Sequence, residues 1–309
     1  MKRLLLATAA AAAFASSLAH AQAPAATPEP TPEHTVTGNM TITTDYRFRG
    51  ISQTFGQGFF TVGPAIQGGI DYSHSSGVYL GNWNSSLSGN QFPNGSSIEM
   101  DFYGGWKHSW DDFGLDIGTI YYAYPGGTKL QGVDSNGNTA YTYVNNWEAY
   151  LGGSWKWFSL KYSYSFTNYF GLSQTAINGL CNPNYSACQT PTLSGLLGRP
   201  PLTQGSLPQN GDTKGTQYLF GAFNYEIMPK LTLTATAGYT WVGNYSQLNY
   251  FDFKVGATYD LAGWLLSANI IGTDADKQYW YACNQGCTSG SKVRDIGTTG
   301  LVLSVGKTF

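Results

Sequence analysis

The chain has 309 residues and a formal net charge of -2, and only 11% of its residues are Asp, Glu, Lys or Arg, whereas soluble globular domains carry about 25%. Gly, Ser, Thr, Asn and aromatic residues take the place of charge. The 16 Lys and Arg are balanced by 18 Asp and Glu, so the chain has no cationic excess, which excludes nucleic acid as a partner. A helical membrane protein is also excluded, because only the first 20 positions approach an apolar run long enough to span a bilayer.

The N-terminus has the layout of a secretory signal peptide. Lys2 and Arg3 give a positive start, an apolar run extends to Leu18, and Ala19-His20-Ala21 fits a small-x-small cleavage site. The apolar run is too short and too rich in Ala for the alternative, a membrane anchor helix. We therefore predict that residues 1–21 are a signal peptide and that the protein leaves the cytoplasm.

The segment that follows is rich in Pro and Ala. It reads APAATPEPTPE from Ala23 to Glu33, and alternating Pro keeps a chain extended and prevents helix and sheet. We predict that residues 22–35 form a periplasmic tether, and that residues 36–309 form one folded unit.

From Val36 onward, apolar and polar residues alternate with a period of two, which is the pattern of a strand with one apolar and one polar face. In the segment from Leu231 to Trp241, for example, apolar residues at odd positions alternate with Thr at even positions. The alternation is least clear in residues 78–85 and 218–225, where both faces carry apolar residues. Strands are expected to begin near residues 36, 59, 77, 98, 114, 144, 158, 216, 231, 250, 263 and 296.

These segments predict an all-β fold, a transmembrane antiparallel up-and-down β-barrel of about twelve strands. The connections after the second, fourth, sixth, eighth and tenth strands are short, and the others are long. Short periplasmic turns and long extracellular loops are typical of outer-membrane barrels. A secreted β-sandwich is the alternative, but its solvent face would carry more charge. Aromatic residues near strand ends, as interfacial girdles require, favour the barrel: Trp106, Trp110, Trp155, Trp157, Tyr239 and Trp241.

Four cysteines are consistent with export to an oxidising compartment. Cys181 lies near Cys188 and Cys283 lies near Cys287, each pair in a polar stretch. Four cysteines allow three pairings, and we favour the two local disulfides. A zinc site is disfavoured, because neither pair has CxxC spacing or a nearby His.

The C-terminal residues have a pattern that resembles the C-terminal strand of an outer-membrane barrel. Leu301, Leu303, Val305 and the terminal Phe309 share one parity, and this form resembles the signal that the barrel-assembly machinery reads. We expect that machinery and outer-membrane lipid to be partners of the chain, with the bacterial outer membrane as its location.

The first predicted hairpin carries a resemblance to a known family. TDYRFRGISQT from Thr44 to Thr54, PAIQGGIDYSHSSG from Pro64 to Gly77, and YLGNW from Tyr79 to Trp83 closely resemble the TorF family of porins, also described as the Gcw_chp family of uncharacterised proteins. The resemblance is looser through the rest of the mature chain to the terminal Phe. It implies an outer-membrane barrel that acts as a porin. Thr44 replaces the usual Ser, and the cysteine-containing loop 168–215 is not a feature of the family.

Charged and polar residues on the polar parity are expected to line the barrel interior. The first strand is predicted to run past Tyr46 and Phe48, on its lipid face, to Arg49. We hypothesise that Arg47 and Arg49 face Glu99 and Asp101 and form a constriction that sets ion preference; the alternative is that these groups only pair to fill a narrow interior. The predicted pore-lining residues are Asp45, Arg47, Arg49, Gln67, Asp71, Glu99, Asp101, Lys107, Glu148, Lys161, Asp252 and Lys254.

These features predict a porin-like channel for passive diffusion of small hydrophilic solutes. The alternative is a closed structural or adhesive barrel that acts through its extracellular loops. Enzymatic activity is not expected, because His34 lies in the predicted tether, His74 beside a periplasmic turn, and His108 on the lipid-facing parity, so no imidazole base reaches the outer rim. No nucleotide loop, metal cluster or cofactor motif is present in the sequence, and we predict no cofactor and no bound metal.

Overall fold

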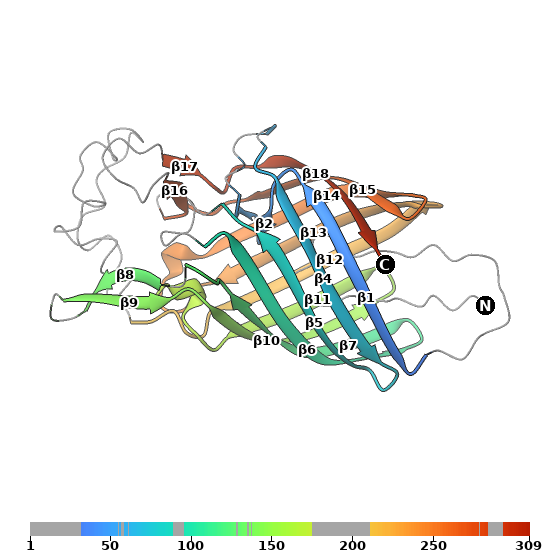
Figure 1. The fold of residues 1–309 in the computed structure, drawn as a ribbon, viewed down its shortest axis with the longest axis horizontal. Helices are drawn as coiled ribbons and strands as arrows, with labels where there is room; N and C mark the ends of the chain where they lie inside the picture. The colour runs from blue at the N-terminus through green and yellow to red at the C-terminus, as the bar shows by residue number, and fades with distance from the viewer. Residues whose placement is uncertain are drawn as a thin grey trace.

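A computed structural model describes residues 32–309 apart from 55, 57–58, 61, 89–95, 128, 135, 137, 175–210, 278 and 284–292. Twelve antiparallel strands close into a barrel in the order β1-β18-β15-β14-β13-β12-β11-β10-β7-β6-β5-β4 (Figure 1), which confirms the predicted fold class. The barrel strands are β1 (His34–Thr43), β4 (Ala65–His74), β5 (Val78–Ser86), β6 (Ile98–Trp110), β7 (Phe113–Ala123), β10 (Asn146–Trp155), β11 (Phe158–Ser165), β12 (Gln217–Met228), β13 (Leu231–Trp241), β14 (Tyr250–Leu261), β15 (Trp264–Thr273) and β18 (Gly300–Thr308).

The two ends of the barrel differ as the sequence predicts. Short turns join β4 to β5, β6 to β7, β10 to β11, β12 to β13 and β14 to β15, and long connections join the other pairs of barrel strands. Gly38 and Phe309 exchange two backbone hydrogen bonds, with N···O distances of 3.1 and 2.8 Å, so β1 pairs with β18 and closes the ring. The start of β1 and the end of β18 lie at the end with the short turns (Figure 1).

The outer face of the barrel is apolar, as the period-two pattern predicts. Ile42, Ile66, Ile70, Leu151 and Val255 are all more than half exposed. Exposed aromatic residues lie near both ends of the strands, which is the arrangement of barrels that span membranes. Those near the short turns are Trp110, Phe113, Trp155, Trp157, Phe158 and Trp264, and those near the long connections are Tyr121, Trp147, Tyr164, Phe166, Trp241 and Phe251.

The two segments with unclear alternation carry aromatic residues that point inward. Tyr79 and Trp83 of β5 are 4% and 3% exposed, and Tyr218 and Phe220 of β12 are 4% and 5% exposed. Apolar residues occupy both faces there because the barrel interior contains its own aromatic cluster.

The first two strands are shorter than the sequence predicts. β1 ends at Thr43 and β4 begins at Ala65, so the prediction of a strand to Arg49 and of a second strand from residue 59 was wrong. Tyr46, predicted to face lipid, is 4% exposed, and Phe48 packs edge-to-face on Tyr122, with ring centroids 5.5 Å apart. The chain leaves the barrel wall after Thr43 because its aromatic side chains bury themselves inside.

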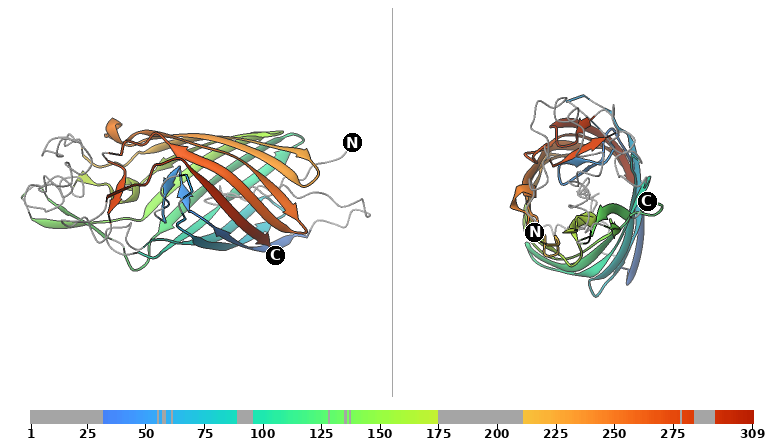
Figure 2. Two further views of the ribbon diagram at one scale, coloured as in Figure 1. Left: turned by 90° about the horizontal axis from the view of Figure 1, so that it is seen from above. Right: turned by 90° about the vertical axis from the view of Figure 1, so that its left-hand side faces the viewer.

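This departure forms a small hairpin inside the barrel, which we call the inner hairpin (residues 45–54). Its strands are β2 (Arg47–Phe48) and β3 (Ile51–Ser52), and the view along the barrel in Figure 2 places it within the ring of strands. Arg49 and Gly50 form its two-residue turn and both have positive φ, 46° and 79°, as a type I′ hairpin turn requires. A side chain at Gly50 would come within 2.9 Å of the Gly272 carbonyl oxygen, so only Gly fits there.

Smaller elements belong to the other long connections. They are β8 (Lys129–Val133) and β9 (Thr139–Tyr143), η1 (Tyr169–Gly171), η2 (Ser246–Leu248), and β16 (Tyr281–Cys283) and β17 (Val293–Asp295). Neither helix of the described part of the chain is long and apolar enough to cross a membrane.

Several predictions concern residues outside the described part of the chain. The signal peptide and all but the last residues of the predicted tether fall there, as do Cys181, Cys188 and Cys287. Cys283 ends β16. The two disulfides therefore stay predictions.

Candidate functional site in the barrel interior

The base of the inner hairpin is held by one buried ion pair. The Asp45 carboxylate pairs with the Arg47 guanidinium, and both side chains are 2% exposed. Asp45 also accepts hydrogen bonds from the hydroxyls of Ser52, at 2.6 Å, and Thr54, at 2.9 Å. Arg47 Nη1 donates to the backbone carbonyl of Thr298 at 2.6 Å. The hairpin is thus fixed to a connection almost at the other end of the sequence.

The tip of the inner hairpin reaches the opposite wall. Arg49 Nη2 donates to both carboxylate oxygens of Glu148 on β10, at 3.0 and 2.7 Å, and the two side chains are 6% and 2% exposed. The guanidinium carbon also lies 4.1 Å from the ring centroid of Tyr218, a cation–π distance. Asn146 Nδ2 and the Ser165 hydroxyl complete the hydrogen bonds to Glu148, at 3.0 and 3.1 Å.

A third contact joins the inner hairpin to β6. The Tyr46 hydroxyl donates to Glu99 at 3.0 Å, and Glu99 and Asp101 are both 0% exposed. We expected Arg47 and Arg49 to face these two acids; that pairing was wrong, because the chain turns inward at Asp45. Ile51 of the hairpin belongs to the same buried cluster as Tyr250 of β14. β6 and β14 lie six places apart in the ring of twelve, so the hairpin spans the interior.

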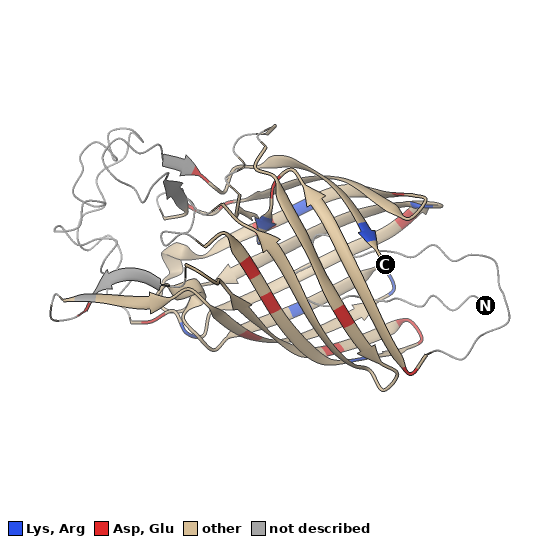
Figure 3. Ribbon diagram, in the orientation of Figure 1, with Lys and Arg blue, Asp and Glu red and all other residues tan. Residues whose placement is uncertain are grey.

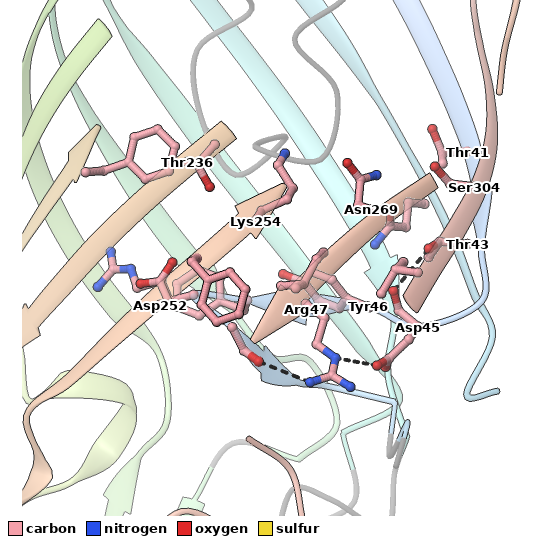
Figure 4. A pocket seen from close by; sticks show the side chains of 18 of the residues that line it. Thr41, Thr43, Asp45, Tyr46, Arg47, Thr236, Asp252, Lys254, Asn269 and Ser304 are labelled. Atoms are coloured by element: carbon pink, nitrogen blue, oxygen red, sulfur yellow. Dashed lines mark hydrogen bonds and ion pairs between the residues drawn. The ribbon is translucent and has the colours of Figure 1, made fainter. Parts of the chain in front are cut away.

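A cavity lies beside the inner hairpin. Its empty volume, which includes open solvent at its mouth, is about 950 Å³. Small or polar residues from four neighbouring strands form its wall: Thr236 on β13, Lys254 on β14, Asn269 on β15 and Ser304 on β18 (Figure 4). These side chains are short or flexible, so they leave space beside the hairpin, and the cavity also reaches Gln67 on β4, Tyr122 on β7 and Lys161 on β11.

The facing wall carries a network of tyrosines and charges. The Tyr79 hydroxyl lies 2.6 Å from Asp116 Oδ1 and 2.5 Å from the Tyr150 hydroxyl. Lys161 Nζ lies 4.8 Å from the ring centroid of Tyr150. Asp116 was missing from the predicted residues. Its neighbours on β7 face outward, so the period-two pattern of that strand already indicates that Asp116 faces the interior.

Apart from Glu99, Asp101 and Glu148, the predicted pore-lining residues fall into two groups. Around the hairpin and the cavity lie Asp45, Arg47, Arg49, Gln67, Lys161, Asp252 and Lys254. Toward the short turns lie Asp71, which accepts from the Tyr103 hydroxyl at 2.5 Å, and Lys107, whose Nζ lies 5.4 Å from the Tyr79 ring centroid. Figure 3 shows how sparsely charges of either sign occur along the strands. The interior therefore holds acids and bases side by side, with neither sign dominating.

Comparisons with known proteins give one family and several structural similarities. The chain is similar to the KdgM porin at 10% identity and a TM-score of 0.44, covering 88% of this chain and 98% of that one. A structure described as KdgM porin in complex with disordered oligogalacturonate has 9% identity and the same TM-score, covering 89% and 98%. For the NanC porin the identity is 10% and the TM-score 0.43, with coverage of 89% and 99%. No curated protein matches the sequence.

The family model described as "Bacterial protein of unknown function (Gcw_chp)" matches residues 27–309. That range includes every barrel strand, the inner hairpin and the terminal Phe309. The chain belongs to the Gcw_chp family of bacterial proteins of unknown function.

Proposed function

We propose that the protein is an outer-membrane porin-like channel through which small hydrophilic solutes diffuse passively. The observation that carries this proposal is the cavity inside the barrel, which Thr236, Lys254, Asn269 and Ser304 line next to the inner hairpin. Polar lining groups are what such a pore needs to pass hydrated solutes. The resemblance of the segment from Thr44 to Trp83 to the TorF porins supports the same function.

The outer surface supports the proposed location. A band of exposed aliphatic residues with aromatic residues at both ends suits a bilayer with two interfaces. The three histidines of the described chain, His34, His74 and His108, lie on the outer face, away from the cavity. A porin-like channel therefore fits the interior better than an enzyme with an imidazole base.

A tryptophan on the cavity wall is expected to slow permeation. Thr236 and Ala235 are neighbours on β13 and face opposite sides of the barrel wall, so Thr236→Trp fills the cavity and Ala235→Trp is its matched control. In liposome swelling with sugars of graded size, we expect the Thr236→Trp rate to fall to about half or less of the wild-type rate, because pore diameter limits passage. Ala235→Trp should swell like the wild type.

Two outcomes would count against this function. Equal swelling rates for Thr236→Trp and the wild type would mean that solutes do not pass through this cavity. Complete impermeability of the wild-type protein, also toward amino acids and small anions, would favour the closed structural or adhesive barrel.

We also propose that Phe309 is read by the barrel-assembly machinery. Phe309 is 69% exposed, while its backbone bonds to Gly38. Deleting Phe309 is expected to lower the amount of folded barrel in outer-membrane fractions, measured by heat-modifiable gel migration. Refolding the same variant into vesicles without the machinery separates loss of the signal from loss of the two backbone bonds. An unchanged amount in cells would contradict the proposal.

A further inference from the structure

Three potential metal ligands meet at the short-turn end of the barrel, outside the cavity. β1 begins at His34, and its register places His34 directly opposite His74 of β4, so both rings project from the outer face. The Ser75 backbone N–H donates to the Glu33 carbonyl at 2.9 Å, which holds Glu33 against the turn after β4. Two hydrogen-bonded strands and their turn thus bring these side chains together.

The spacing of the three side chains suits one small cation. His74 Nε2 lies 3.4 Å from Glu33 Oε1, and the two imidazole centroids are 5.0 Å apart. One candidate ligand atom from each of Glu33, His34 and His74 lies within 4.8 Å of the other two. Ligands of tetrahedral zinc, at about 2.0–2.2 Å from the metal, are about 3.4 Å apart. Because the Glu33 and His74 side chains are 70% and 29% exposed, rotation about their side-chain bonds can close the remaining gap.

The Nδ1 atom of each imidazole also lies within hydrogen-bond distance of a hydroxyl group. His34 Nδ1 lies 2.9 Å from the Tyr72 hydroxyl, and His74 Nδ1 lies 2.7 Å from the Ser76 hydroxyl. Metal-bound histidines have such partners at the nitrogen that does not bind the metal, because the bond fixes the tautomer and orients the ring. In the structure, His74 Nδ1 accepts a hydrogen bond from the Ser76 backbone N–H at 3.1 Å. Metal binding through Nε2 requires the proton on Nδ1, which then donates to the Ser76 hydroxyl, and the bond from the Ser76 N–H is given up.

We propose that Glu33, His34 and His74 bind a divalent transition metal of the zinc class at the short-turn rim of the barrel. Two imidazoles and one carboxylate are a ligand set that this class of metal accepts, with the fourth position left to water. Glu33 directly precedes β1, so the metal would fasten the start of the barrel to the β4–β5 turn. The site is separate from the cavity, so the metal-site proposal does not depend on the proposed channel.

Titration calorimetry with Zn²⁺ tests this site on the mature chain, purified without a polyhistidine tag in detergent micelles. We expect one zinc ion per barrel, and we expect His34→Gln and His74→Gln each to weaken binding at least about tenfold. Glu33→Gln should also weaken binding. His108→Gln is the matched control, because His108 lies on the outer face of the same end, between Trp106 and Trp110, and should bind zinc like the wild type.

The experiment can overturn the proposal in two ways. Absence of zinc binding by the wild-type barrel would do so, as would wild-type affinity in the His34→Gln/His74→Gln double variant, since the metal would then be held elsewhere. Heat-modifiable gel migration confirms that each variant is folded. Liposome swelling on the same variants is expected to stay at the wild-type rate, because none of the three residues lines the cavity.

Discussion

Glu148→Ala is expected to lower the free energy of unfolding by about 3–5 kcal/mol, because it leaves a buried guanidinium without its partner. Arg49 is 6% exposed and both of its bonds to Glu148 are lost at once. Water cannot replace the carboxylate fully, since Tyr218 and Phe48 lie over the guanidinium at 4.1 and 4.9 Å. Urea unfolding of the barrel in lipid vesicles, followed by tryptophan fluorescence, measures the loss.

A double variant shows whether the unpaired charge causes the loss. Arg49→Met/Glu148→Leu removes both charges and keeps similar volumes, so it should recover most of the stability that Glu148→Ala loses. Glu148→Gln keeps the size of the side chain and, through its one carbonyl oxygen, the contacts with Asn146 and Ser165, so any loss that it shows comes from the charge and from the Oε2 acceptor of Arg49. If the double variant is as unstable as Glu148→Ala, the unpaired guanidinium is not the cause of the loss.

Removing the inner hairpin is expected to raise the conductance of the barrel about twofold or more, because the hairpin spans the interior and pore cross-section limits ion flow. The excision is feasible since the Gly63 N–H donates to the Thr44 carbonyl at 2.8 Å, so a short Gly-Ser linker can replace residues 46–62. Single-channel recordings in planar bilayers measure the conductance, and swelling with larger sugars measures the size limit.

The β8–β9 hairpin provides the control for this excision. It extends beyond the barrel wall at the end with the long connections (Figure 1), so replacing it with a linker should leave conductance near the wild-type value. Equal conductance for the wild type and the variant without the inner hairpin would remove the hairpin from the solute path. It would also show that the resistance lies elsewhere in the barrel.

The barrel wall was predictable from the sequence, because the order of residues within one strand already determines which side chains face lipid and which face the interior. Side chains alternate between lipid and interior along each strand, so a period of two reveals most strands without knowledge of their partners. The alternation of short and long connections follows from the same segments. The structure confirms both features, with most strand starts within a few residues of their predicted positions.

The inner hairpin was not predictable in the same way. Tyr46 and Phe48 continue the alternation of β1, and only their contacts with Glu99 and Tyr122 take them off the wall. Those contacts join residues far apart in the sequence, so no local pattern reports them. The Arg49-Gly50 pair was the available signal, because a Gly at that position permits a tight turn.

The prediction missed Asp116 in the interior and misplaced His34 at the short-turn end, for different reasons. Asp116 was overlooked although its parity is clear. His34 was assigned to the tether because prolines precede it, yet β1 already pairs at His34 and sets it opposite His74. That pairing depends on strand register, which sequence alone leaves open.

The contacts of the inner hairpin join the beginning of the barrel to its last connection. The hairpin comes from the first connection of the chain, but it is held by Glu99, Glu148 and the carbonyl of Thr298. The last of these lies two residues before β18, the strand that closes the ring. The contact with Thr298 can form only when this last connection is in place, so the docking of this early segment is complete only then. Until then, the aromatic residues of the hairpin and the Arg49 guanidinium have only part of the environment that buries them.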